Sequence, residues 1–132
     1  GDCRELKLPD ASRDAVIIQG GLHHLPDMPA DVIACLDEVR RILRPDGRFL
    51  VVEPWWTPFL RFVHFVHTFR LPRRLWPKLD ALAVMTEREA TTYFSWLGKA
   101  DELLPLFEER FVLERRFIGF GKLMIVGRPR PR

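Results

Sequence analysis

The sequence predicts an α/β fold in which a helix joins two parallel strands. Residues 15–18 and 49–52 form short apolar runs without polar alternation, which is typical of strands covered on both faces. Between them, residues 29–44 place apolar side chains at steps of three and four, as one face of a helix does. The connections are short, so the order strand, helix, strand indicates a parallel crossover.

Proline, glycine and helix-capping residues mark where further helices and strands begin and end. Residues 45–47, Pro-Asp-Gly, are predicted to end the first helix. Thr86 and Glu89 have the spacing of a capping box, which predicts a helix that opens there and stops at Gly98. A further helix is expected over 100–109, shortened or bent by Pro105. Residues 111–120 and 122–127 are predicted to be antiparallel strands joined around Gly121, with a frayed tail over 128–132.

Residues 54–79 differ from the rest of the chain in charge and aromatic content. They contain five Lys or Arg residues, seven Phe or Trp residues and no acidic residue. A helical stripe formed by Phe59, Phe62, Val63, Val66 and Phe69 has three interpretations: core packing, a lid over an apolar ligand, or a helix lying on a membrane surface. We predict a helical, aromatic insertion or lid over 54–98 within a single domain, 1–132.

Composition excludes several classes of protein. A net charge of +3 and the lack of a known nucleic-acid motif argue against a nucleic-acid partner. Two cysteines, Cys3 and Cys35, are too few for a disulfide framework, so we expect a reducing, cytoplasmic setting. His64 and His67 have a metal-binding spacing, but neither a carboxylate nor a cysteine lies nearby in the sequence. No metal site is predicted.

Two loops follow the predicted parallel strands, where open parallel sheets bind their ligands. In residues 19–25, paired glycines either let a ligand approach the backbone or simply make a tight turn. The adjacent His23 and His24 would point in opposite directions; one is a candidate general base, or one caps the loop while the other packs. Glu53, at the end of the second strand, is a rival base.

The order of these segments resembles a known family. Leu22-His23-His24-Leu25, the run from Glu38 to Gly47 and the run from Phe49 to Pro54 are similar to those of class I S-adenosylmethionine-dependent methyltransferases. The branch is the small-molecule, type 11-like group that includes enzymes of ubiquinone and menaquinone biosynthesis. The resemblance covers residues 1–54, and the last two strands resemble the antiparallel end of that fold. It implies a partial Rossmann-like methyltransferase sheet with a helical insertion.

The resemblance also implies a cofactor, S-adenosylmethionine, and roles for matched positions. Asp2 would accept a hydrogen bond from the adenine amino group, and the backbone N–H of Cys3 would meet the same ring. Gln19 and Gly20 would lie along the methionine part. Leu22 and His24 would face the cofactor or a small-molecule acceptor. The expected acceptor pocket adds Trp55, Trp56 and Phe59, and the expected catalytic residues are His23, His24 and Glu53.

The chain departs from the family in two ways. It lacks the glycine-rich turn that holds the carboxypropyl group of the cofactor, and it lacks the acidic residue that binds the ribose hydroxyls. Gly119 and Gly121 lie between two late strands, so they do not fit the cofactor loop. The sequence therefore resembles a C-terminal half, and we expect weak or absent methyl transfer to a small, apolar acceptor. The alternative is a non-catalytic pairing module. Because residues 15–18 would form an open edge, we expect a homodimer or a missing N-terminal half to complete the sheet.

Overall fold

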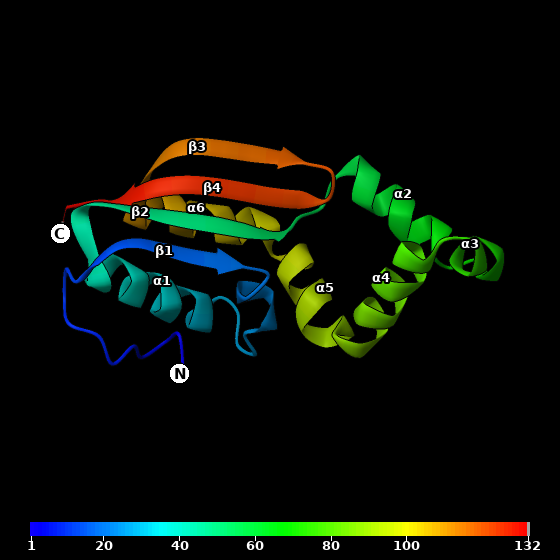
Figure 1. Ribbon diagram of the computed structural model, residues 1–132, viewed down its shortest axis with the longest axis horizontal. Helices are drawn as coiled ribbons and strands as arrows, with labels where there is room; N and C mark the ends of the chain where they lie inside the picture. The colour runs from blue at the N-terminus through cyan, green and yellow to red at the C-terminus, as the bar shows by residue number, and fades with distance from the viewer. Residues whose placement is uncertain (132) are drawn as a thin grey trace.

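The computed structural model describes residues 1–131 and contains one four-stranded mixed sheet (Figure 1). The strands are β1 (Arg13–Gln19), β2 (Leu43–Pro54), β3 (Phe111–Gly119) and β4 (Lys122–Pro129), in the order β1-β2-β4-β3. β1 and β2 are parallel, whereas β4 is antiparallel to both β2 and β3. The predicted parallel pair and the predicted C-terminal antiparallel pair are confirmed, and pairing between β2 and β4 joins them.

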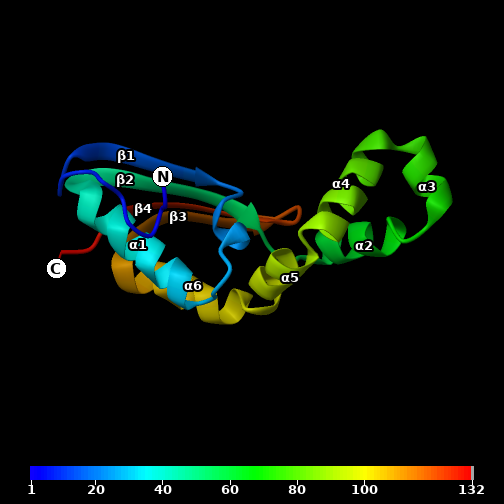
Figure 2. The ribbon, with the colours of Figure 1, turned by 90° about the horizontal axis from the view of Figure 1, so that it is seen from below.

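Two helices cover one face of the sheet. α1 (Ala30–Ile42) and α6 (Ala100–Arg110) lie side by side beneath it in Figure 2. Side chains of a strand alternate between faces, so Phe49, Val51 and Glu53 of β2 all point toward these helices and are buried. The Phe49 ring lies 4.8 Å from the Phe111 ring and 6.3 Å from the Phe107 ring, measured between centroids. This aromatic cluster anchors β2, whose far end carries the candidate site.

The opposite face and the outer edge of the sheet are open. Among the described residues, β1 pairs only with β2, and the side chain of Ile17 on β1 is 68% exposed. Phe117 and Met124 are exposed on the antiparallel strands. The prediction that residues 15–18 lie at a sheet edge is confirmed. Completion of the sheet by another chain or segment stays a prediction.

Residues 45–47, predicted to end the first helix, lie inside β2 instead. α1 ends at Ile42 and β2 begins at the next residue. The pairing with β1 jumps from Arg13–Leu43 to Ala15–Arg48, which makes residues 44–47 a bulge in the ladder. A Cβ atom on Gly47 would lie 3.0 Å from the carbonyl oxygen of Arg44, so a glycine fits this crowded place.

The predicted capping box is also wrong. α4 (Pro77–Arg88) starts nine residues before Thr86 and includes it, and α5 (Ala90–Gly98) begins only after Glu89. Pro at the first position favours the earlier start. Thr86 is buried on the last turn of α4, and its hydroxyl has no hydrogen-bond partner within the described residues. The ends predicted at Gly98 and near residue 109 are confirmed to within a residue.

The C-terminal tail is more ordered than predicted. β4 continues to Pro129, and the N–H of Arg130 donates to the carbonyl oxygen of Arg110 at 2.9 Å. Arg130 also donates from Nε to the carbonyl oxygen of Glu108. The prediction of fraying is therefore wrong for residues 128–130, and Arg132 lies outside the described residues.

Four helices separate β2 from α6 in the sequence: α2 (Pro58–Val66), α3 (Arg70–Leu75), α4 and α5. Figure 1 shows α2, α3 and α4 as a lobe beyond the sheet end where β1 and β2 terminate, with α5 leading back to α6. Thr57 caps α2 through its Oγ1, which accepts hydrogen bonds from the N–H groups of Leu60 and Gly121 at 3.0 Å. None of the described helices is long and apolar enough to cross a membrane.

Candidate functional site

Glu53 is the buried polar centre at the carboxyl ends of β1 and β2. Its side chain is fully buried. Burying a carboxylate costs free energy unless hydrogen bonds compensate for the lost water. Oε1 accepts hydrogen bonds from the N–H groups of Gly21 and Leu22, each at 2.8 Å. Oε2 lies 2.8 Å from Nδ1 of His23, on the short helix η1 (Leu22–His24). The carboxylate therefore fixes both the loop after β1 and the orientation of the His23 ring.

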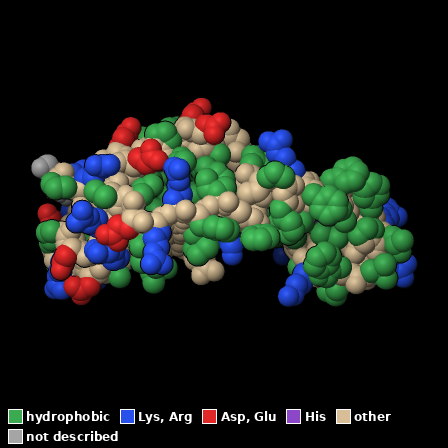
Figure 3. All heavy atoms as spheres, turned by 90° about the horizontal axis from the view of Figure 1, so that it is seen from above, with side chains coloured by type: hydrophobic (Ala, Val, Ile, Leu, Met, Phe, Trp, Pro, Cys, Tyr) green, Lys and Arg blue, Asp and Glu red, His purple; other side chains and the backbone are tan. Residues whose placement is uncertain are grey.

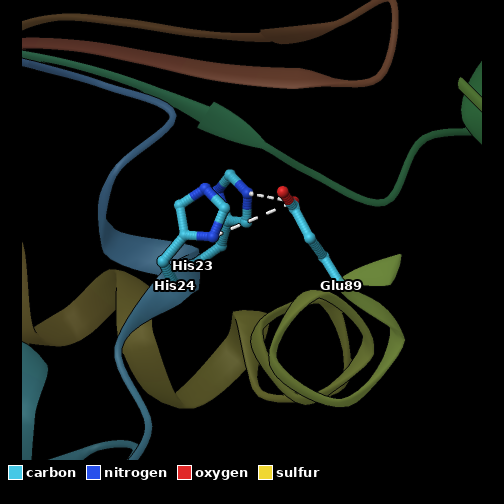
Figure 4. A group of neighbouring side chains, drawn as sticks. All are labelled: His23, His24 and Glu89. Atoms are coloured by element: carbon cyan, nitrogen blue, oxygen red, sulfur yellow. Dashed lines mark ion pairs between the residues drawn. The ribbon is translucent and has the colours of Figure 1, made fainter. Parts of the chain in front are cut away.

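His23 turns its other ring nitrogen toward Glu89. Nε2 is buried without a hydrogen-bond partner in the described residues and lies 3.6 Å from Oε2 of Glu89. Nδ1 of His24 lies 3.8 Å from the same oxygen (Figure 4). Glu89 comes from the junction of α4 and α5, and sequence reasoning gave it only a capping role. Three polar side chains from two distant segments thus converge, and two of them, His23 and His24, were predicted site residues.

The pKa of His23 is raised above its ordinary value. Burial alone lowers it, but the hydrogen bond and negative charge of Glu53, together with those of Glu89, outweigh burial. With Nδ1–H donated to Glu53, the lone pair of neutral His23 is on Nε2. The pair can accept a proton at that atom and stabilise the resulting cation.

An apolar hollow of about 260 Å³ lies beside this pair. Gln19, Gly20 and Glu53 line it from the strand ends, and Leu60, Leu82, Met85 and Tyr93 line it from the lobe and α5. Gly20 has φ +59°, a left-handed conformation that favours glycine, and its N–H donates to the carbonyl oxygen of Val52 at 2.8 Å. The structure thus brings three of the predicted site residues, Gln19, Gly20 and Glu53, together at this hollow.

Comparison with known proteins relates this arrangement to one enzyme family. A family model described as "Methyltransferase domain" matches residues 1–51. A demethylmenaquinone methyltransferase of Streptomyces avermitilis is 33% identical over 126 residues, which cover 93% of this chain and 48% of that protein. Its counterpart in Beutenbergia cavernae is 36% identical over 97 residues, 70% of this chain and 36% of that protein. Together, these matches support the class I S-adenosylmethionine-dependent methyltransferases as the family of this chain.

Solved structures agree on the fold of this chain. A protein of Pyrococcus horikoshii matches with a TM-score of 0.61 at 24% identity, over 98% of this chain and 57% of that one. An S-adenosylmethionine-dependent methyltransferase of Methanosarcina mazei matches with a TM-score of 0.60 at 15% identity, over 98% and 65%. The chain spans about half or less of the length of the curated relatives described above.

The predicted adenine-binding residues of this chain lie beside the start of α1. Asp2 is exposed, and its carboxylate already accepts four hydrogen bonds from Arg4, which also pairs with Asp31. These hydrogen bonds lower the pKa of Asp2 to about 2. Cys3 is half-buried and packs against the core near Cys35, and burial raises the pKa of the Cys35 thiol. Neither Asp2 nor Cys3 lines the hollow, so their roles toward adenine stay predictions.

The predicted acceptor-binding aromatic residues take three different positions. Trp55 is buried edge-to-face against Trp96, with 6.1 Å between ring centroids. Trp56 is half-buried, with the guanidinium of Arg61 5.5 Å from its ring centroid. Phe59 is 48% exposed and contacts Phe120. Among these three, none lines the hollow. The lobe residues that do line it carry no recognisable motif, so only the folded chain identifies them.

Two histidine groups have the chemistry of metal ligands. Ligand atoms of His23, His24 and Glu89 all lie within 4.8 Å of one another, so this set could hold a cation. His64 and His67 instead form a hydrogen bond with each other, with 2.9 Å between Nδ1 of His64 and Nε2 of His67. Nε2 of His64 lies 3.0 Å from the Tyr93 hydroxyl. Burial lowers the pKa of His64. Both of its ring nitrogens are therefore engaged within the lobe and α5.

Proposed function

We propose that this chain forms the acceptor side of an enzyme that methylates a small, apolar aromatic ring of the quinol class. The observation that carries the proposal is the Glu53–His23 pair, whose free ring nitrogen faces polar groups beside an apolar hollow at the strand ends. Demethylmenaquinone methyltransferases among the relatives support a ring of this kind as the acceptor. Glu53 lines the hollow and His23 lies behind it, so an apolar space next to one oriented base is available for such a ring.

The residues at the strand ends fit part of S-adenosylmethionine. When bound, that cofactor supplies a methyl group on a positively charged sulfur, and the bonding electron pair returns to the sulfur on transfer. Gln19 and Gly20 line the hollow, and the left-handed Gly20 leaves its backbone unshielded there. Asp2 would have to release Arg4 before it could bind the adenine amino group. The fit is therefore better at the methionine end than at the adenine end.

In this proposal, His23 acts as the general base and Glu53 as its positioning residue. Nε2 of His23 takes the proton that the acceptor loses, and the ring keeps the electron pair that forms the bond to the methyl carbon. Glu53 holds Nδ1–H and stabilises the charged imidazole. Glu89 and His24 lie on the far side of Nε2, where they can orient an acceptor hydroxyl.

The test is transfer of a labelled methyl group from S-adenosylmethionine to a short-chain demethylmenaquinol, using the full chain. His23→Gln should reduce the rate by about 100-fold or more. His24→Gln is the matched control and should reduce it less. Chelation of divalent metals should leave the rate unchanged. A His23→Gln rate equal to that of the unchanged chain, or a rate abolished by chelation, would overturn the proposed role of His23 as a base.

A second candidate function is a non-catalytic pairing module, favoured by the open edge of β1. Ile17 is 68% exposed on a strand with unpaired backbone groups along one side. If pairing is the function, the chain should form a dimer in analytical ultracentrifugation. Ile17→Lys should dissociate that dimer, whereas Met124→Lys, on a central strand, should not.

A further inference from the structure

We propose that the helical lobe lies on an anionic lipid surface through its exposed aromatic face. That face is defined by large apolar residues of α2, α3 and the segments beside them: Phe59, Phe62, Phe65, Phe69, Leu71, Leu75 and Trp76. The inference goes beyond the proposed reaction and does not require it, because attachment involves neither cofactor nor acceptor.

The residues of the exposed aromatic face gather on the lobe. On α2, Leu60 is buried against the β3–β4 turn, whereas Phe62 and Phe65 are 64% and 62% exposed. No residue of α3 is buried, and Leu75 at its end is 76% exposed. Figure 3 shows hydrophobic side chains gathered over the lobe, with Lys and Arg at its margins. Single exposed apolar residues are ordinary, but a clustered set marks an interaction surface.

The charges around this face have one sign. Arg73 is neutralised by Asp80 at 2.8 Å and Glu87 at 3.3 Å. By contrast, Arg61, Arg70, Arg74 and Lys78 are exposed, and no carboxylate among residues 1–131 lies within ion-pair distance of them. Around the sheet, cations such as Arg48 and Arg110 have acidic partners. A positive rim without acidic neighbours is complementary to a negatively charged surface.

An anionic bilayer is the occupant that satisfies both features at once. Helices that lie in the bilayer interface bury an aromatic face among the acyl chains and keep Lys and Arg at the headgroups. Each Lys or Arg near such a surface strengthens binding by about fivefold. The lobe also links this face to the hollow, because Leu60 of α2 and Leu82 and Met85 of α4 line it. A bilayer could therefore deliver an apolar acceptor directly to the site.

The test is co-sedimentation of the full chain, without cofactor, with phosphatidylcholine vesicles that contain or lack phosphatidylglycerol. We expect binding only to the vesicles that contain phosphatidylglycerol. Salt should weaken this binding, because the Debye screening length falls to about 3 Å at 1 M ionic strength. Phe62→Ser with Phe65→Ser, and separately Arg70→Glu with Arg74→Glu, should each weaken binding by at least about tenfold. The matched controls are Ile17→Ser and Arg115→Glu, exposed residues of the sheet, which should bind normally.

Trp76 provides a direct measure of contact. Its side chain is 57% exposed, so its fluorescence should shift to the blue on binding and be quenched by brominated lipid, and Trp76→Phe should remove that change. Equal binding to both vesicle types, or none by a chain whose circular dichroism shows it folded, would overturn the proposal. So would a dimer that Phe62→Ser dissociates, since the face would then bind a second copy. Methyl transfer without vesicle binding would refute this inference alone.

Discussion

The sheet region and the helical lobe differ in how many side chains they bury. In the sheet region, α1, α6 and the strands bury a shared core, and Glu53 is held by three hydrogen bonds. In the lobe, α3 buries no residue and α2 buries only Leu60. The difference indicates that the sheet region orients the chemical groups, while the lobe supplies apolar walls and an exposed surface. Substitutions should therefore affect stability in one region and binding in the other.

The largest expected effect is at Phe49, at the centre of the sheet region. Phe49→Ala removes a fully buried ring that packs between Phe107 and Phe111. The free energy of unfolding should fall by about 3–5 kcal/mol. Urea denaturation followed by circular dichroism measures it, and a loss under 1 kcal/mol would mean that this core does not anchor β2.

Glu53→Gln tests how the sheet region holds the site. The amide keeps the shape but replaces one carboxylate oxygen, so the contact with Nδ1 of His23 or an N–H of the loop is lost. The free energy of unfolding should fall by about 1–3 kcal/mol. Glu87→Gln, on the surface of α4, is the matched control and should change stability little. Equal effects of the two variants would contradict a special role for Glu53.

The pH dependence of stability sharpens the same point. Because the pKa of His23 is raised in the folded chain, its charged form stabilises the fold. This contribution is complete below the unfolded value of 6.5 and is lost as pH rises through the raised folded pKa. The free energy of unfolding should therefore fall over that window, and His23→Gln should remove this part of the fall. His24→Gln leaves the contact between His23 and Glu53 in place, so this variant should keep the same fall in the free energy of unfolding.

The smallest expected effect on stability is in the lobe. Phe62→Ser changes a side chain that is mostly exposed, so the free energy of unfolding should change by less than about 0.5 kcal/mol. The same variant, combined with Phe65→Ser, is expected to weaken vesicle binding strongly. Thermal unfolding beside vesicle sedimentation checks both, and a large loss of stability would show that this face packs against protein.

Local patterns predicted the sheet region better than the lobe. Apolar runs and helical periodicity placed β1, α1, β3 and β4, because these signals act over a few residues. The bulge at 44–47 escaped prediction because it depends on pairing with β1. The position of Glu89 beside His23 depends on how α4 and α5 turn back onto η1, which joins residues 66 positions apart. Glu53 was predicted from its place at a strand end, but its three partners were not.

The measurement that tests the central claim most directly is calorimetric titration of the full chain with S-adenosylhomocysteine. If the strand ends form the methionine side of a cofactor site, binding should be detected, and Gly20→Val should abolish it. Valine strains the left-handed backbone and places a side chain toward His23, since even a Cβ atom there would lie 3.7 Å from its Cε1. Absence of binding at millimolar ligand, or equal binding by Gly20→Val, would contradict the assignment of these strand ends to the cofactor.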